Sequence, residues 1–330
     1  MNNIDSIRTL ELHYHFNEED KSHTMDAFVR NKCEQEILHI INEISKELKI
    51  QIKVETEAFD EGGLTEYYSF FATAEGQAIL SLSEIILVII GIVLTRVPSR
   101  KSKLDREEQR LSIEEKKLNI EILKKELEEK KIEIPSLNIE NIEYVTINNI
   151  KIRKHKSNFY KSLKQYPKVN KVSVTKLNTN RKPIENPLIT ERRDFGNFIL
   201  ESDILEPLTD ENASLEIISP VLKKGKYKWK GIYDKTLKPI DFSMKDRDFR
   251  ENVVSNSVPF KNGAFIDCIL EIERKIDDLG LIYNSNYSVI TVLKHYEDGI
   301  SFETPQGKKH RQKKEADKMQ LRLFDDNNNE

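Results

Sequence analysis

The sequence predicts an α+β protein of several domains: a small N-terminal β-α-β module, an apolar helix, a coiled-coil stalk and a mostly β C-terminal barrel or sandwich. Three observations lead to this: a strand-helix-strand pattern, a long apolar run, and short alternating strands in the last third. The 330 residues suffice for two or three domains. The expected segments are an α/β module (1–77), an apolar or transmembrane helix (78–97), a stalk (98–134), a basic segment (135–194), a β-rich domain (195–305) and a disordered tail (306–330).

The N-terminal module begins with a strand-like run at 10–16. Apolar residues then recur every three or four positions from Val29 to Leu48, which predicts an amphipathic helix of roughly six turns. Residues 50–55 alternate between apolar and polar side chains, as in a half-buried strand.

The apolar run covers residues 78–95 and holds one charge, Glu84. Such a run is long enough to cross the hydrocarbon core of a bilayer. The basic cluster that follows it places the C-terminal part in the cytoplasm by the positive-inside rule. The side chains expected in lipid are Ile85, Ile86, Val88, Ile89, Ile92 and Val93. Two alternatives stay open: the helix dips into the membrane without crossing, or an oligomer buries it in solution.

The stalk is predicted from leucines seven residues apart, Leu104, Leu111 and Leu118, in a stretch rich in Lys and Glu. This spacing favours a coiled coil and therefore a homo-oligomer. The alternative is a single solvated helix that lies against another domain.

The basic segment has eleven Lys and Arg residues and no acidic residue between 144 and 184. Phosphate backbones and anionic lipids attract such a block, and aromatic side chains within it could stack on bases. We expect strands at 145–152 and 169–174 and a short helix at 158–165. The candidate anion-binding residues are Lys154, Lys156, Phe159, Tyr160, Lys161, Lys164 and Lys168. The alternative is a solvated basic face, or one that docks on the acidic N-terminal unit of a neighbouring chain.

The β-rich domain is predicted from short apolar runs separated by turns, and its tail from Gln306 is expected to be disordered. The expected strands are 215–218, 227–233, 240–244, 265–272 and 287–293, with a short helix at 245–253.

Candidate catalytic and metal-binding groups are sparse. His13, His15 and His23 form the densest histidine group and are weak candidates for zinc or iron, against a plain polar strand face. Asp267, Glu271 and Glu273 suggest a metal-dependent nuclease, but the alternation puts these acids on a solvated face. The sequence has no Walker loop, GxSxG or HExxH. We therefore expect no cofactor and no enzyme activity.

The stretch DKSHTMDAFVRNKCEQEIL, followed by an EGGL turn, an apolar helix and a Lys/Glu stalk, resembles uncharacterised bacterial membrane-tethered coiled-coil proteins of mobile-element and phage-defence loci. The stretch SPVLKKGKYKWKGIY resembles part of a β-domain repeated in other uncharacterised bacterial proteins. This resemblance implies an oligomeric sensor or effector at the inner membrane. Its cytoplasmic C-terminal half would bind a ligand, a nucleotide, nucleic acid or a partner protein encoded nearby. The alternative is a cytoplasmic nucleic-acid-binding protein or metal-dependent nuclease that uses the apolar helix as its oligomer core.

Overall fold

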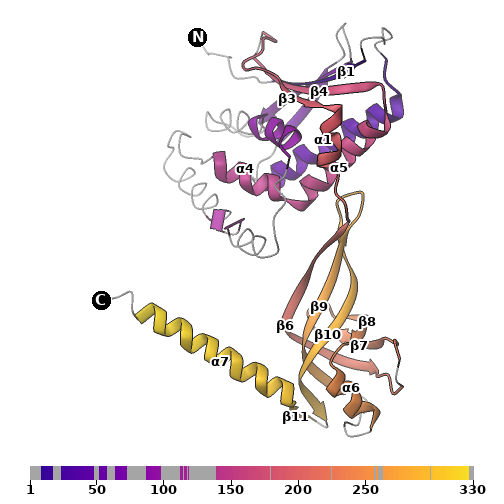
Figure 1. Ribbon diagram of the computed structural model, residues 1–330, viewed down its shortest axis with the longest axis vertical. Helices are drawn as coiled ribbons and strands as arrows, with labels where there is room; N and C mark the ends of the chain where they lie inside the picture. Colours follow the sequence, from indigo (N-terminus) through magenta and orange to yellow (C-terminus); the bar gives the residue numbers. More distant parts are fainter. Residues whose placement is uncertain are drawn as a thin grey trace. The chain divides into compact units, whose positions relative to one another are not determined.

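The chain forms two compact units in the computed structural model (Figure 1). Unit 1 comprises Met1–Glu201 and Asp278–Leu281, and unit 2 comprises Ser202–Asp277 and Ile282–Glu330. The structure describes residues 9–17, 24–47, 52–57, 64–72, 87–97, 112–113, 115–116, 118, 139–178, 180–223, 225–255, 258, 263–297 and 299–326.

Unit 1 is built on an antiparallel sheet with the strand order β2-β3-β1-β4-β5. Helix α1 lies between β1 and β2 in the sequence, and α5 precedes β4. This is the β-α-β-β-α-β arrangement known as the split βαβ, with β5 added at one edge. Its strands are β1 (Thr9–Phe16), β2 (Ile52–Glu57), β3 (Leu64–Ala72), β4 (Val169–Leu177) and β5 (Leu188–Glu191), and its helices include α1 (Ala27–Glu47), α4 (Ile139–Asn148), α5 (Ile150–Gln165) and the 3-10 helix η2 (Arg192–Phe198).

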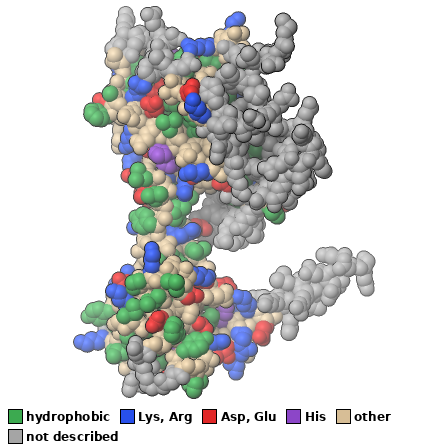
Figure 2. Space-filling model, turned by 180° about the vertical axis from the view of Figure 1, so that it is seen from behind, with side chains coloured by type: hydrophobic (Ala, Val, Ile, Leu, Met, Phe, Trp, Pro, Cys, Tyr) green, Lys and Arg blue, Asp and Glu red, His purple; other side chains and the backbone are tan. Residues whose placement is uncertain are grey.

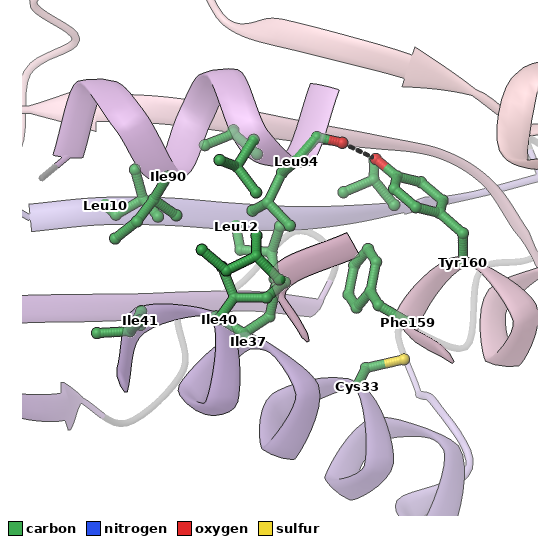
Figure 3. Packing of buried hydrophobic residues seen from close by; sticks show 14 of the residues in the cluster. Leu10, Leu12, Cys33, Ile37, Ile40, Ile41, Ile90, Leu94, Phe159 and Tyr160 are labelled. Atoms are coloured by element: carbon green, nitrogen blue, oxygen red, sulfur yellow. Dashed lines mark hydrogen bonds between the residues drawn. The ribbon is translucent and has the colours of Figure 1, made fainter. Parts of the chain in front are cut away.

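The core of unit 1 lies on one face of this sheet. Alternate residues of β1, such as Leu10 and Leu12, are fully buried, and so is the stripe of α1 that includes Ile37 and Ile40 (Figure 3). Period-two alternation in the strand and three/four spacing in the helix bring these side chains together.

The apolar run forms a helix at 87–95 that belongs to this core. Leu87, Ile90 and Leu94 are at most 1 % exposed, and the Tyr160 hydroxyl donates a 2.6 Å hydrogen bond to the Leu94 carbonyl (Figure 3). A Cβ placed on Gly91 would lie 3.3 Å from a Leu188 methyl group, so glycine lets this helix approach the sheet closely. The described part of the run is apolar because most of its side chains are buried in the core of unit 1.

The prediction of a membrane helix is therefore wrong. Ile89 and Val93 are buried in the core, Val88 and Ile92 are half-buried, and Ile85 and Ile86 lie outside the described residues. Within the described ranges, no helix combines the length and the apolarity that a bilayer span requires. This finding removes the basis for the predicted inner-membrane location.

The predicted coiled-coil stalk is also corrected. Leu104 and Leu111 lie outside the described residues, and Leu118 is 59 % exposed. Ile113 packs against the core of unit 1, and the Lys116 ammonium lies 4.3 Å from the centre of the Tyr144 ring in α4. This part of the segment thus contacts its own unit.

The predicted strand at 145–152 is wrong as well, because two helices meet there. Asn149 separates α4 from α5, and its side-chain oxygen accepts hydrogen bonds from the backbone N–H groups of Lys151 and Ile152. Asparagine is a preferred N-cap, so the local sequence starts a helix at this point.

Unit 2 contains a closed five-stranded barrel in which β6, β7, β8, β10 and β9 follow one another around the wall. The β8–β10 pair is parallel and the others are antiparallel, with α6 between β8 and β9 in the chain. This connectivity is that of an OB-fold. The elements are β6 (Ile204–Ser219), β7 (Trp229–Tyr233), β8 (Lys238–Met244), α6 (Arg247–Val254), β9 (Phe265–Ile276), β10 (Ile282–Glu297), β11 (Ile300–Glu303) and α7 (Pro305–Asp326).

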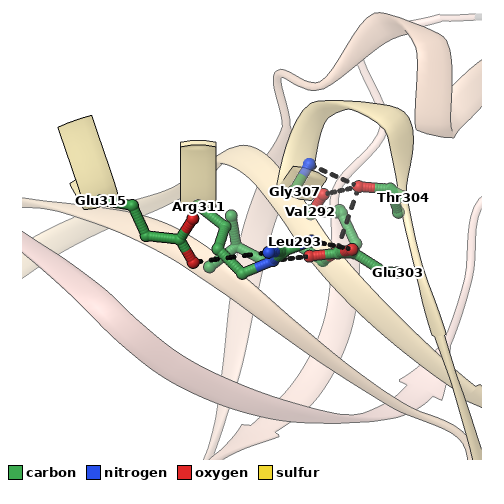
Figure 4. A network of polar contacts seen from close by, with 7 residues as sticks. All are labelled: Val292, Leu293, Glu303, Thr304, Gly307, Arg311 and Glu315. Carbon is green, nitrogen blue, oxygen red and sulfur yellow. Dashed lines mark hydrogen bonds and ion pairs between the residues drawn. The ribbon is translucent and has the colours of Figure 1, made fainter. Parts of the chain in front are cut away.

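Residues 306–326 of the expected disordered tail belong instead to the helix α7, and residues 327–330 lie outside the described residues. Thr304 begins it: its hydroxyl donates to the Val292 carbonyl of β10 and accepts from the Gly307 N–H (Figure 4). The Arg311 guanidinium bonds both carboxylate oxygens of Glu303, at 2.9 and 3.1 Å. Threonine followed by proline is a helix-start signal, and these contacts fix the first turns to the barrel.

Gly307→Ala is expected to destabilise unit 2, although helix propensity alone predicts a gain of about 1 kcal/mol. The new Cβ would lie 2.1 Å from the Leu293 carbonyl oxygen, which is backbone and cannot move aside cheaply. We expect a loss of about 1–3 kcal/mol, measured by urea unfolding. Gln312→Ala is the control, because Gln312 is exposed on the same helix and alanine there changes helix propensity without a new contact with the barrel. A stabilised Gly307→Ala protein would contradict the packing described here.

Candidate nucleic-acid interface

The aromatic residues predicted to stack on bases lie in the core of unit 1. Phe159 is fully buried and Tyr160 is 1 % exposed (Figure 3). The centre of the Tyr160 ring lies 4.2 Å from that of the Phe198 ring. These rings fill the space between α5, the helix at 87–95 and η2. The stacking role assigned to them from the sequence is therefore wrong.

Two of the predicted anion-binding lysines are buried too. The Lys156 ammonium donates a 3.0 Å hydrogen bond to the Arg96 carbonyl, just after the helix at 87–95, and lies 5.3 Å from the centre of the Phe198 ring. Burial, with a smaller contribution from Arg153, lowers the pKa of Lys156 to about 7. Lys154 pairs with Asp278 at 2.9 Å. Both ammonium groups therefore have polar partners within unit 1.

The other three lysines of that prediction have different surroundings. Lys161 and Lys164 are exposed on α5. Lys168 is half-buried, with its ammonium 3.4 Å from the Thr24 hydroxyl and 4.8 Å from the centre of the Phe16 ring.

A buried polar network in unit 1 was not predicted. Glu36 accepts hydrogen bonds from Asn158 at 3.2 Å and contacts His155 Nδ1 at 2.7 Å. Asn158 also donates to the Asp278 carbonyl at 2.8 Å. Gly280 approaches so closely that a Cβ there would lie 2.6 Å from His155 Nε2, and its φ of 76° suits glycine. The network ties α1 and α5 to the 278–281 turn of the same unit.

The histidines predicted as weak metal ligands are stacked on β1. The rings of His13 and His15 are 4.0 Å apart and parallel within 2°, and His15 shares a 2.8 Å hydrogen bond with Ser173. Burial lowers the pKa of both imidazoles, that of His15 to about 4. His23 lies outside the described residues. No group of three or more metal-ligating side chains occurs in the described part of the chain.

The acids considered for a nuclease are engaged separately on unit 2. Asp267 accepts a 2.7 Å hydrogen bond from the Tyr296 hydroxyl, and Glu271 pairs with Lys245 at 2.8 Å. Glu273 accepts from the Asn286 amide. Each acid has its own partner.

The loop between β6 and β7, residues 220–228, is the most basic feature of the barrel, and we call it the basic loop. Residues 219–233 hold five lysines and no acidic residue. Across the described ranges, no carboxylate lies within ion-pair distance of Lys223, Lys226 or Lys230. Figure 2 shows Lys and Arg side chains, together with Asp and Glu, beside exposed hydrophobic ones on one face of unit 2. Ion pairs with described carboxylates therefore do not cancel the positive charge of these three ammonium groups.

An exposed aromatic ring lies among the lysines of the basic loop. Tyr227 is 64 % exposed. Gly225 has a φ of 152°, and a Cβ there would lie 2.7 Å from the Tyr227 ring, so glycine lets the ring rest on the loop. The Lys228 ammonium donates to the Asn286 side chain at 2.9 Å and ties the loop to β10.

The outer face of β7 and β8 continues from the loop. Lys230 lies opposite Asp241 in register, and Ile232 lies opposite Pro239. Lys230, Pro239 and Asp241 are exposed, while Trp229 and Phe242 fill the barrel. The face therefore has the half-buried Ile232 and the exposed Pro239 as its apolar centre, and the cation Lys230 faces the acid Asp241 at the end next to the loop.

The charge count that singles out 144–184 also identifies the basic loop. Five lysines in fifteen acid-free residues are a higher density than eleven cations in forty-one. No family model, curated protein or solved structure matches this chain, so functional assignment depends on its geometry.

Proposed function

We propose that unit 2 binds single-stranded nucleic acid along the basic loop and the outer face of β7 and β8. The observation that carries this proposal is the exposed Tyr227 ring among lysines without carboxylate partners in the described part of the chain. OB-folds bind oligonucleotides on the face of their second and third strands and through the loop between the first two. Those positions correspond to β7, β8 and the basic loop.

The chemistry favours a single strand over a duplex. Lysine ammonium groups attract phosphates without regard to sequence, and binding is strengthened by release of counterions. A tyrosine ring stacks on a base only where the base is unstacked from its neighbours. Tyr227 and the flanking lysines thus supply both contacts that a single strand needs.

Tyr227→Ala is expected to weaken binding of a labelled single-stranded oligonucleotide by about 5- to 150-fold, because base-aromatic stacking contributes about 1–3 kcal/mol. Fluorescence anisotropy measures this with DNA and RNA oligonucleotides in parallel. Tyr227→Phe is the matched control and should keep most of the affinity, since the ring remains. Equal affinities of wild type and Tyr227→Ala would refute the stacking contact.

The lysines are tested by salt dependence. The double variant Lys223→Ala and Lys226→Ala should lower the slope of log affinity against log salt by about 0.7 for each phosphate that the protein no longer neutralises. Lys161→Ala with Lys164→Ala, on α5 of unit 1, is the matched control and should leave the slope unchanged. If only the α5 variant reduces the slope, the phosphates bind to the 144–184 segment and the proposal fails.

A further inference from the structure

One side of helix α7 contacts the barrel. Its N-terminal turn packs on β10 through Thr304 and Gly307, Arg311 pairs with Glu303, and Lys314 pairs with Glu211 at 2.9 Å. At 100° per residue, positions 307, 311 and 314 fall on one side of the helix. These contacts hold the first turns as a rigid extension of unit 2.

The opposite side carries cations that these contacts do not use. Lys308, Lys309 and Lys313 are exposed, and helical spacing places them within one stripe about 140° wide. Among the carboxylates whose side chains the structure describes, which on α7 end before residue 317, none lies within ion-pair distance of these three ammonium groups. Residues 304–314 contain no acid. The nearby acids Glu303, Glu315 and Glu211 pair with Arg311 and Lys314 instead.

We propose that this α7 stripe is a second contact surface for the phosphate backbone of the nucleic acid that unit 2 binds. The inference rests on the proposed function. Lys309 and Lys313 are one helical turn apart, about 5–6 Å between Cβ atoms, so adjacent ammonium groups can engage successive phosphates of one strand. None of Lys308, Lys309, Gln312 and Lys313 offers an aromatic ring for stacking. The stripe therefore adds affinity without sequence preference and with strong salt dependence.

The α7 stripe should increase affinity only for a nucleic-acid strand that is long enough to extend beyond the β7–β8 face. An OB-fold contacts about 4–16 nucleotides, so an oligonucleotide of about 8 should occupy the basic loop and the β7–β8 face alone. One of about 40 nucleotides is long enough to reach α7 as well. The triple variant Lys308→Gln, Lys309→Gln and Lys313→Gln removes the charge and keeps side-chain length on an exposed surface.

With the long oligonucleotide, this variant should lower the slope of log affinity against log salt by up to about 2, or about 0.7 per phosphate. With the short one, affinity and slope should equal those of the wild type. The matched control carries the same change of three charges on unit 1, at Lys161, Lys164 and Lys182. Far-UV circular dichroism checks that α7 remains folded.

Three results would overturn the inference: no effect on the long oligonucleotide, equal weakening with both lengths, or equal weakening in the control. No effect on the long oligonucleotide would indicate a solvated basic face. Either of the other two results would indicate a general effect of net charge. Failure of the proposed function differs from all three, because the wild-type protein would then not bind the short oligonucleotide.

Discussion

Glu36→Ala is expected to destabilise unit 1 by about 3–5 kcal/mol, because it removes the partner of two buried groups at once. Glu36 is 6 % exposed and His155 is 2 % exposed. Without the carboxylate, the imidazole and the Asn158 amide lose hydrogen bonds in a place that excludes water. Urea unfolding followed by far-UV circular dichroism measures the loss of stability.

The chain offers an internal control for this variant. Its single tryptophan, Trp229, lies in the core of unit 2, so fluorescence reports on that unit. The transition seen by circular dichroism should shift further than the fluorescence transition. Glu36→Gln, which preserves an oxygen acceptor and side-chain length, should cost markedly less. An unshifted transition in Glu36→Ala would mean that the network contributes little to stability.

Lys156 is expected to make the stability of unit 1 rise with pH above neutrality. Burial lowers its folded-state pKa to about 7, whereas an unfolded lysine titrates near 10.4. Between these values the unfolded state binds more protons, so the free energy of unfolding increases with pH, by at most about 1.4 kcal/mol per unit. Below pH 7 both states are protonated and this contribution is constant.

Lys156→Met should abolish that rise. The difference in unfolding free energy between variant and wild type, measured from pH 6 to pH 9.5, should favour the variant most at the acidic end and decline toward the basic end. Taking the difference cancels groups that titrate alike in both proteins. Lys161→Met, at an exposed position on the same helix, is the control and should give a difference that does not change with pH. A constant difference for Lys156→Met would show that its ammonium is not desolvated.

The strands were the most predictable part of the fold, because period-two alternation is a local property. The run expected at 10–16 is β1 (Thr9–Phe16), and that expected at 240–244 lies within β8 (Lys238–Met244). The start of α7 also has a local signal, since Thr304 is followed by proline, but the polar composition of the tail masks it.

The environment of the apolar helix could not be predicted in the same way. A helix that is mostly buried in a protein core has the composition of a membrane span, and the elements that cover it, α5 and β4, come more than fifty residues later. The prediction of a strand at 145–152 misses the apolar stripe of α5, in which Ile152, Phe159 and Leu163 face the core. Likewise, the sequence does not show that Lys154 has an ion-pair partner, because that partner, Asp278, is distant in sequence.

The candidate site shows the same limit of local reasoning. A count of charges identifies basic stretches, but it does not say which ammonium groups have partners. In the 144–184 segment the fold uses Lys154 and Lys156 internally, whereas Lys223 and Lys226 of the basic loop lie away from the carboxylates of the described residues. Only the three-dimensional arrangement distinguishes the two.

The helix at 87–95 is synthesised well before some of the elements that bury it. The ribosome makes it more than seventy residues before β4, the strand that joins the β1–β3 part of the sheet to β5. At about 5–20 residues per second, the nascent chain carries this apolar segment without its cover for roughly 4–15 s. Aggregation during production should therefore concentrate in that interval, and slower translation between residues 96 and 168 should lower the yield of folded protein.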